Sequence, residues 1–345
     1  MYNRIIDEDM DYILNSHCIE WNKFTKSNIL ISGATGLICS MTVKALVCAN
    51  KKHDLGLTVY CSVRNISKAE KMFADILDSG AVKFIQNGTE LEAAENVRFD
   101  YIIHGAAPTA SKFFVDNPVE TISAMVNDTM RFLEVAKLSS SKGLVYLSSM
   151  EAYGMVSDET PLTEDKLGTV DLSNVRSSYP ESKRMSELIC KAYSSEYNIR
   201  AMSIRLAQTF GPGVSIDDKR VFAMMARSAI NKEDIILLTK GESRHPYLYT
   251  AQATEAILCV LLNGEAGETY NAANPQTYCS IYEMGQMVAK EIADGKINVR
   301  IEESSENKKY PPASYLNLDI NKIMNIGWKP SGTLADMYTR MMATM

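Results

Sequence analysis

The sequence predicts an α/β protein, a doubly wound parallel sheet with a smaller C-terminal lobe. Apolar runs and helix-like segments alternate over about 180 residues of the chain. The apolar runs are continuous rather than alternating, which is typical of parallel strands that are covered on both faces. After residue 210 the alternation stops and prolines recur, which indicates a lobe of short elements.

Composition bounds the class of protein. The chain has 345 residues, 46% apolar and 23% charged, which is enough to bury a sizeable core and excludes a disordered chain. Its net charge of −6 argues against a nucleic-acid partner, and no apolar run approaches the length of a membrane span. Seven cysteines without a CxxC pair predict free thiols, no metal site and, with no leader peptide expected, a cytoplasmic location.

The elements follow from local patterns. Residues 1–26 are expected to form a helical extension, because apolar residues such as Ile5, Met10 and Ile13 share a helical face. Each strand is expected at a short apolar run, and each helix at a longer stretch with apolar residues three or four apart. Strands are predicted at 28–32, 57–63, 82–86, 101–104, 144–148 and 200–206, and helices at 40–49, 67–77, 119–138 and 179–197.

A glycine-rich turn joins the first strand to the first helix. Gly33 permits the tight turn, and Gly36 lets backbone N–H groups approach a pyrophosphate at the helix N-terminus. The third position is Cys39 rather than the usual glycine, so we expect slightly wider packing and an intact site. The turn predicts a dinucleotide cofactor. Its expected cofactor contacts are Gly33, Thr35, Gly36, Leu37 and Ile38.

The end of the second strand bears on which cofactor binds. An acidic residue there would bond to the ribose 2′-hydroxyl of NAD, but this chain has Ser62-Val-Arg64-Asn65. Arg64 could face a 2′-phosphate or stack on adenine. Both NAD and NADP therefore stay open.

A tyrosine and a lysine lie four residues apart on the expected helix 179–197. Tyr179 and Lys183 share one face of it, and Ser148 and Ser149 lie at the carboxyl end of a strand, where ligands bind in such sheets. We expect the ammonium and the cofactor's positive charge to lower the pKa of Tyr179. The set predicts a general base for a substrate alcohol.

These motifs together resemble one family. The motifs are Gly33-Ala-Thr-Gly36-Leu-Ile, His104-Gly-Ala-Ala107, Leu147-Ser-Ser-Met-Glu-Ala-Tyr-Gly154, Tyr179-x-x-x-Lys183 and Arg205-Leu-x-x-x-Phe-Gly-Pro212. From about residue 27 to 330 the chain resembles the extended short-chain dehydrogenase/reductase family, and within it the nucleotide-sugar epimerases, dehydratases and decarboxylases. We predict a Rossmann cofactor domain at 27–206, to which 248–274 returns, and a substrate lobe at 207–247 and 275–345.

The resemblance implies roles at matching positions. Tyr179 would be the base, Lys183 would hold the nicotinamide ribose, and Ser149 would bond to the sugar 4-oxygen. The cofactor would also be lined by Ala106, Ala107 and Ser148. The substrate would be held by Ser149, Gln208, Arg220 and Arg244, with the two arginines on the nucleotide or diphosphate. Asn127 matches a structural asparagine of the helix behind the site.

The chain departs from the dehydratases at one catalytic position. They carry Thr-Asp-Glu where this chain has Ser149-Met150-Glu151, and Met150 cannot donate the proton that expels a 6-hydroxyl. Glu151 remains as a catalytic candidate that could abstract a proton at C5 or position a carboxylated sugar.

The favoured hypothesis is an NAD(P)-dependent enzyme that transiently oxidises C4 of a nucleoside-diphosphate sugar. Its outcome would be 4-epimerisation or decarboxylation of a uronic acid rather than 4,6-dehydration. Two alternatives stay open: a net NADPH-dependent reductase of a carbonyl substrate, and a non-catalytic cofactor-binding member. The resemblance further implies a homodimer formed through helices 119–138 and 179–197. The candidate contacts are Met185, Leu188, Ile189 and Ala192, which could equally pack on the sheet.

Overall fold

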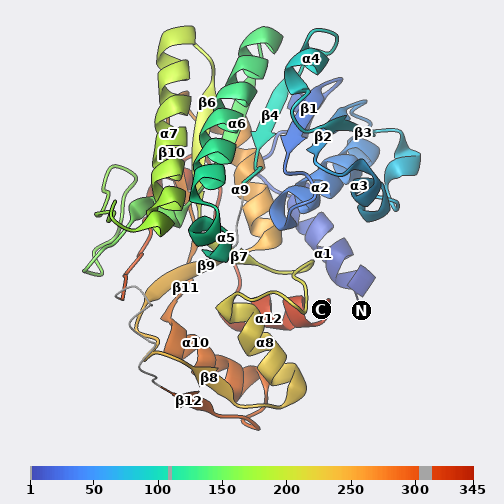
Figure 1. Cartoon of the computed structure of the whole chain (residues 1–345). Helices are drawn as coiled ribbons and strands as arrows, with labels where there is room; N and C mark the ends of the chain where they lie inside the picture. Colours follow the sequence, from blue (N-terminus) through green and yellow to red (C-terminus); the bar gives the residue numbers. More distant parts are fainter. Residues whose placement is uncertain (1, 108–110, 303–312) are drawn as a thin grey trace.

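A parallel sheet forms the larger part of the protein. The computed structural model describes residues 2–107, 111–302 and 313–345 (Figure 1). Within them the sheet has seven strands in the order β10-β6-β5-β4-β1-β2-β3. The strands are β1 (Asn28–Ser32), β2 (Thr58–Val63), β3 (Val82–Gln86), β4 (Tyr101–His104), β5 (Gly143–Ser149), β6 (Ala201–Leu206) and β10 (Thr269–Ala272). The order reverses between β1 and β4, and in open α/β sheets ligands bind at the carboxyl ends of the strands at such a switch point. The predicted fold class is confirmed.

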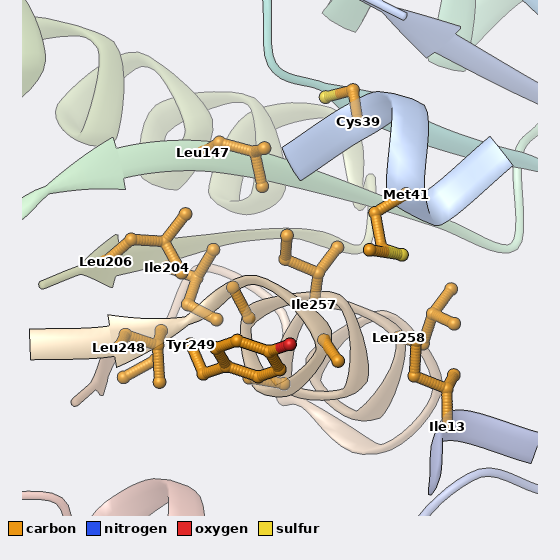
Figure 2. Close-up of a cluster of buried hydrophobic side chains, with 14 of the residues drawn as sticks. Ile13, Cys39, Met41, Leu147, Ile204, Leu206, Leu248, Tyr249, Ile257 and Leu258 are labelled. Carbon is orange, nitrogen blue, oxygen red and sulfur yellow. The ribbon is translucent and has the colours of Figure 1, made fainter. Parts of the chain in front are cut away.

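Helices cover both faces of this sheet, which explains why its strands are continuously apolar. On one face lie α4 (Glu90–Ala94), α6 (Pro118–Ser139) and α7 (Ser178–Tyr197), and on the other α2 (Leu37–His53) and α9 (Thr250–Asn263). The helix α3 (Ile66–Met72) and the turn η2 (Leu77–Ser79) lead into β3. Side chains from β5 and β6, such as Leu147 and Ile204, point toward Ile257 of α9 (Figure 2).

The N-terminal extension adds a further layer outside α2 and α9. It consists of α1 (Tyr2–Leu14) and the short helix η1 (Trp21–Phe24). Ile13 and Phe24 are fully buried, and Ile13 lies beside Leu258 of α9 (Figure 2). Trp21 Nε1 donates to the Leu14 carbonyl at 3.1 Å, which ties the two helices together.

The smaller lobe lies beyond the carboxyl edge of the sheet (Figure 1). Its strands are β7 (Gln208–Phe210), β8 (Ile235–Leu237), β9 (Arg244–Tyr249), β11 (Asn274–Ser280) and β12 (Val299–Ile301). Its helices are α8 (Val221–Asn231), α10 (Ile281–Met287), η5 (Val288–Ile292), α11 (Asn321–Asn325) and α12 (Leu334–Met342). Between β9 and β11 the chain returns to the larger unit as α9 and β10. The exact domain boundaries stay a prediction. No helix in the described part of the chain is long and apolar enough to cross a membrane.

Cys39 packs into the space left by a second glycine. Its side chain is buried on α2, and a Cβ atom at Gly105 would overlap the Cys39 sulfur and approach Leu147 Cδ1 to 2.9 Å. Close approach is therefore kept because residue 105, on the loop after β4, has no side chain. We expected Cys39 to hold the helix and the strand farther apart. Instead, the missing side chain at Gly105 makes room for the Cys39 sulfur.

We predict that Gly105→Ala lowers the free energy of unfolding by about 1–3 kcal/mol, because it overpacks this contact. Cys39→Ala in the same chain should restore part of that loss, since the two positions contact each other. Urea unfolding of both single variants and the double variant measures the coupling. Gly285→Ala is the control, because its Cβ would make only an ordinary 3.4 Å contact. Additive single effects would contradict the proposed packing.

Candidate active site

Three side chains four residues apart form the buried face of α7. Tyr179, Lys183 and Glu187 all face inward. Lys183 Nζ donates to the Leu147 carbonyl at 2.7 Å and lies 5.7 Å from the centre of the Tyr179 ring. The Tyr179 ring stacks on Phe114 of α5 (Ser111–Asp116), with centroids 4.2 Å apart. The structure therefore places the tyrosine–lysine pair at the carboxyl end of β5.

The protein itself holds the Tyr179 phenol neutral. Burial raises the pKa of Tyr179 well above its usual value of 10, and the charge of Glu151 raises it further. A hydrogen bond with Ser149 and the charge of Arg176 lower the pKa but do not outweigh burial. The expected lowering by the Lys183 ammonium is not seen in the protein alone, where Lys183 points to a backbone carbonyl.

Lys183 is a buried cation. Burial lowers its pKa to about 8, while the charges of Glu187 and Glu151 act in the opposite direction. The side chain is therefore mostly protonated at pH 7 and loses its charge just above neutrality.

A buried ion pair behind Lys183 was not predicted from the sequence. Glu187 accepts hydrogen bonds from Arg205 Nε at 3.0 Å and Nη2 at 2.7 Å. Ser148 Oγ also donates to Glu187, at 2.5 Å. The Ser148 O–H donor is thus committed to this pair, and its oxygen can still accept a hydrogen bond. Two features of the sequence could have indicated this pair: Glu187 follows Lys183 by four residues, and Arg205 belongs to the Arg205-Leu motif.

The glycine turn is a backbone cradle. Gly33 has a φ of 63°, Gly36 N donates to its carbonyl at 2.8 Å, and Gly36 precedes the first residue of α2. A Cβ at Gly33 would lie 2.9 Å from Ala106. Ser32 Oγ accepts from the N–H groups of Gly105 and Ala106 at 3.0 Å, which fixes this loop.

This cradle fits the pyrophosphate of a dinucleotide, because its walls are backbone and the long helix α2 starts from it. Thr35, Leu37 and Ile38 are half-buried around the first turn of α2. Ala107 packs against the cluster that contains Phe114 and Tyr179. A Cβ at Gly213 would lie 3.2 Å from Leu37 Cδ1, so the loop after β7 also approaches the turn, a contact that the sequence analysis missed.

Arg64 is exposed at the end of β2. Its carbonyl accepts from Gln86 Nε2 at 3.3 Å, and the side chain of the next residue, Asn65, caps α3 by accepting from Lys68 N at 2.9 Å. The Arg64 guanidinium therefore faces solvent beside the expected adenosine end of the cofactor.

Both predicted diphosphate arginines are paired with carboxylates of this chain. Arg220 Nη2 lies 2.6 Å from Asp218. Arg244 lies 2.9 Å from Glu283 and 3.7 Å from Glu159. A diphosphate would have to exchange with these partners. Half-buried Gln208 opens β7, where it pairs with Tyr247 of β9.

Glu151 lies in the short helix η3 (Met150–Tyr153), where its N–H donates to Ser149 Oγ at 3.2 Å. Its carboxylate is 2.9 Å from Nη2 of Arg176, in the turn η4 (Val175–Ser177) that leads into α7. The structure thus brings together Ser149, Glu151 and Tyr179, and adds Arg176, which the sequence analysis did not single out.

Asn127 lies on α6, the helix that packs against α7, but its side chain does not point toward the site. Asn127 is exposed on α6 and donates to Ser123 Oγ at 3.0 Å. Met125, two residues earlier and so on the opposite side of the helix, is buried against Phe114 and Tyr179.

A doubly wound sheet with a phosphate-binding turn and a Tyr–Lys pair at its carboxyl edge is the arrangement of a nicotinamide-dependent enzyme. The family model described as "NAD dependent epimerase/dehydratase family" matches residues 29–273, and the chain belongs to this family. The resemblance to the extended short-chain dehydrogenase/reductases and the prediction of an enzyme are confirmed.

Several proteins whose names describe enzymes of nucleotide sugars are similar to this chain in sequence or in fold. The chain is 27% identical to UDP-glucuronic acid decarboxylase 6 of Arabidopsis thaliana over 325 residues, 91% of this chain and 88% of that protein. The UDP-glucose 4-epimerase structure from Thermotoga maritima superposes with a TM-score of 0.76 at 20% identity, covering 92% and 98% of the two chains. The UDP-glucuronic acid 4-epimerase from Bacillus cereus, in complex with UDP-glucuronic acid and NAD, gives 0.75 at 18% identity, with the same coverage.

The buried Lys183 predicts a pH-dependent stability difference between the wild type and Lys183→Met. Between pH 8 and 10.5 the unfolded chain binds more protons at this lysine than the folded protein, so the wild type gains stability as pH rises. Relative to Lys183→Met the gain should approach roughly 3 kcal/mol. Urea unfolding at pH 7 and pH 10 measures it. Lys51→Met, which removes an exposed lysine of α2, is the control. A constant difference would show that Lys183 is not buried as a cation.

Proposed function

We propose that this protein modifies a nucleoside-diphosphate sugar through transient oxidation at C4. The observation that carries the proposal is the convergence of Ser149, Tyr179 and Lys183 at the end of β5, opposite the glycine turn. Membership of the NAD dependent epimerase/dehydratase family supports it, as do the names of relatives that act on UDP-glucuronic acid.

In the first step of the proposed reaction, different residues of the chain would bind the cofactor and move the proton. The turn at Gly33 and Gly36 would hold the cofactor pyrophosphate, and Lys183 would face the nicotinamide ribose. Bound NAD would supply the acceptor for a hydride from the sugar carbon and the donor for its later return. Tyr179 takes the proton of the 4-hydroxyl, and Ser149 holds the same oxygen by a hydrogen bond. Because Tyr179 is neutral in the protein alone, its action as a base depends on positive charge beside it.

The 4-ketone formed in this way permits two further reactions. A carboxylate on C5 is β to the ketone, so its carbon can leave as CO₂ while the electron pair stays at C5 and then takes a proton. Alternatively, return of the hydride to the other face of C4 inverts that centre. Glu151, whose charge acts on Tyr179, would exchange a proton with C5. Met150 has no proton to give a 6-hydroxyl, which disfavours dehydration.

A second candidate function is supported by Arg64. Its exposed guanidinium and the lack of an acid at the end of β2 suit a 2′-phosphate, as a net NADPH-dependent reductase would need. Consumption of one NADPH per product would support this second function, whereas turnover with a catalytic amount of NAD would support the first proposal.

Free thiols at all seven cysteines suit the cytoplasmic location that we propose.

We predict that the wild type converts at least one member of a panel of UDP-, dTDP-, GDP- and CDP-sugars when NAD is supplied. Tyr179→Phe should lower the rate by about 10²–10⁴-fold, because it removes the proton acceptor. Mass spectrometry of the nucleotide sugars measures conversion. Tyr197→Phe, on an exposed part of the same helix, is the control. A panel left unconverted by the wild type, or an active Tyr179→Phe, would refute the proposal.

We also propose a homodimer formed by the outer faces of α6 and α7. Met185, Leu188 and Ala192 form an exposed stripe on α7. Large apolar side chains are exposed on α6 as well, among them Ile122 and Met130. Ile189 packs inward against the core between α6 and the sheet, and therefore leaves the candidate contact set.

Replacing the centre of this stripe should produce a monomer. Met185→Arg combined with Leu188→Arg places two like charges on each facing helix of a twofold interface. Sedimentation equilibrium should give two chains for the wild type and one for the variant. Leu172→Arg, at an exposed apolar residue outside α6 and α7, is expected to leave the mass unchanged. A monomeric wild type would exclude the dimer.

A further inference from the structure

Arg176 is the arginine near Tyr179 with donor groups to spare. Arg205 donates from all three of its side-chain nitrogens, to Glu187 and to the carbonyl of Glu164. Arg184 spends its N–H groups on Glu181 and on three backbone carbonyls, those of Ala152, Tyr153 and Gly168. Among the described residues, the Arg176 side chain makes one hydrogen bond, to Glu151.

The Arg176–Glu151 ion pair is partly exposed, so either side chain can bond to another partner. Its side chains are 35% and 33% exposed, whereas those of Arg205 and Glu187 are 4% and 8% exposed. A partly exposed ion pair contributes little to stability because water competes for both groups. An incoming anion can therefore replace Glu151 at small cost, which it cannot do at the buried pair.

The pair also lies beside the reacting group. The Arg176 guanidinium carbon is 6.0 Å from the centre of the Phe114 ring, which stacks directly on Tyr179. Both charges act on the phenol, since Glu151 raises and Arg176 lowers the pKa of Tyr179. A sugar whose 4-hydroxyl reaches Tyr179 would therefore place its C5 substituent near these two side chains.

We propose that Arg176 selects a uronic acid by exchanging Glu151 for the carboxylate on C5 of the substrate. This inference rests on the proposed function and names its substrate class. The planar guanidinium matches a carboxylate with two parallel N–H donors, whereas a neutral hydroxymethyl group cannot replace Glu151. The exchange also frees the Glu151 carboxylate beside C5. Arg176 is thus a specificity residue, and Tyr179 remains the proton acceptor.

The test compares binding of UDP-glucuronic acid and UDP-glucose by calorimetry, with NAD present. Arg176→Gln should weaken UDP-glucuronic acid by about 10- to 100-fold, the range for a charge-assisted hydrogen bond, and UDP-glucose by less than about 3-fold. Arg176→Lys should recover part of the loss. Glu151→Gln should tighten UDP-glucuronic acid, because it removes the competing carboxylate, while lowering turnover. Arg300→Gln breaks an Arg–Asp pair on β12 and is the matched control, with no effect expected.

The outcomes separate this inference from the proposed function. If the wild type binds UDP-glucose as tightly as UDP-glucuronic acid, or binds neither, the inference is overturned. Equal losses for both ligands in Arg176→Gln, or weaker binding of UDP-glucuronic acid in Glu151→Gln, also overturn it. Any of these results combined with conversion of another nucleotide sugar would leave the proposed function standing. Failure to convert any nucleotide sugar would remove the proposed function itself.

Discussion

The arrangement of the site depends on the buried ion pair between Glu187 and Arg205. Its carboxylate joins α7 to Arg205 of β6 and to Ser148 of β5, so it fixes the helix against two strands at once. Lys183 and Tyr179 lie about one and two turns away on the same face, so their positions follow from this anchor. Loss of one partner would leave an uncompensated buried charge, which proteins tolerate poorly. The pair thus positions the face of α7 that carries Tyr179 and Lys183.

The arginines of the proposed ligand site, unlike Arg205, form ion pairs that are partly exposed. The chain carries a net charge of −6, yet the ligands of the proposed reaction are anions. Arg176, Arg220 and Arg244 each carry a carboxylate partner of the chain and are partly exposed. Because these pairs are partly exposed, each arginine could exchange its partner for a ligand oxygen at small cost. In the proposed function, binding would then depend on the positions of a few arginines rather than on net charge.

The sequence predicted what local pattern controls. The six expected strands, the glycine turn and the Tyr179–Lys183 spacing all correspond to elements of the structure. The helix α9 was missed because residues 250–262 are all buried, which leaves no polar face and no helical period. Arg176 and Glu187 were missed because their partners, Glu151 and Arg205, are distant in the chain, and only the fold pairs them. The Ile189 side chain packs against the core, and this orientation likewise depends on residues that are distant in the sequence.

The opposed charges at Tyr179 connect substrate choice to the course of the reaction. A substrate carboxylate on Arg176 adds a second negative charge beside Glu151, which further disfavours the phenolate. Deprotonation of Tyr179 would then depend on further positive charge, such as that of a bound cofactor, because the Lys183 cation does not lower the pKa of Tyr179 in the protein alone. The carboxylates of Glu187 and Glu151 favour the protonated form of Lys183. In the proposed decarboxylation, departure of CO₂ would remove the added charge and leave a neutral sugar that Arg176 could not hold. Glu151 would then pair with Arg176 again, so the exchange proposed for binding a uronic acid would also favour release of the decarboxylated product.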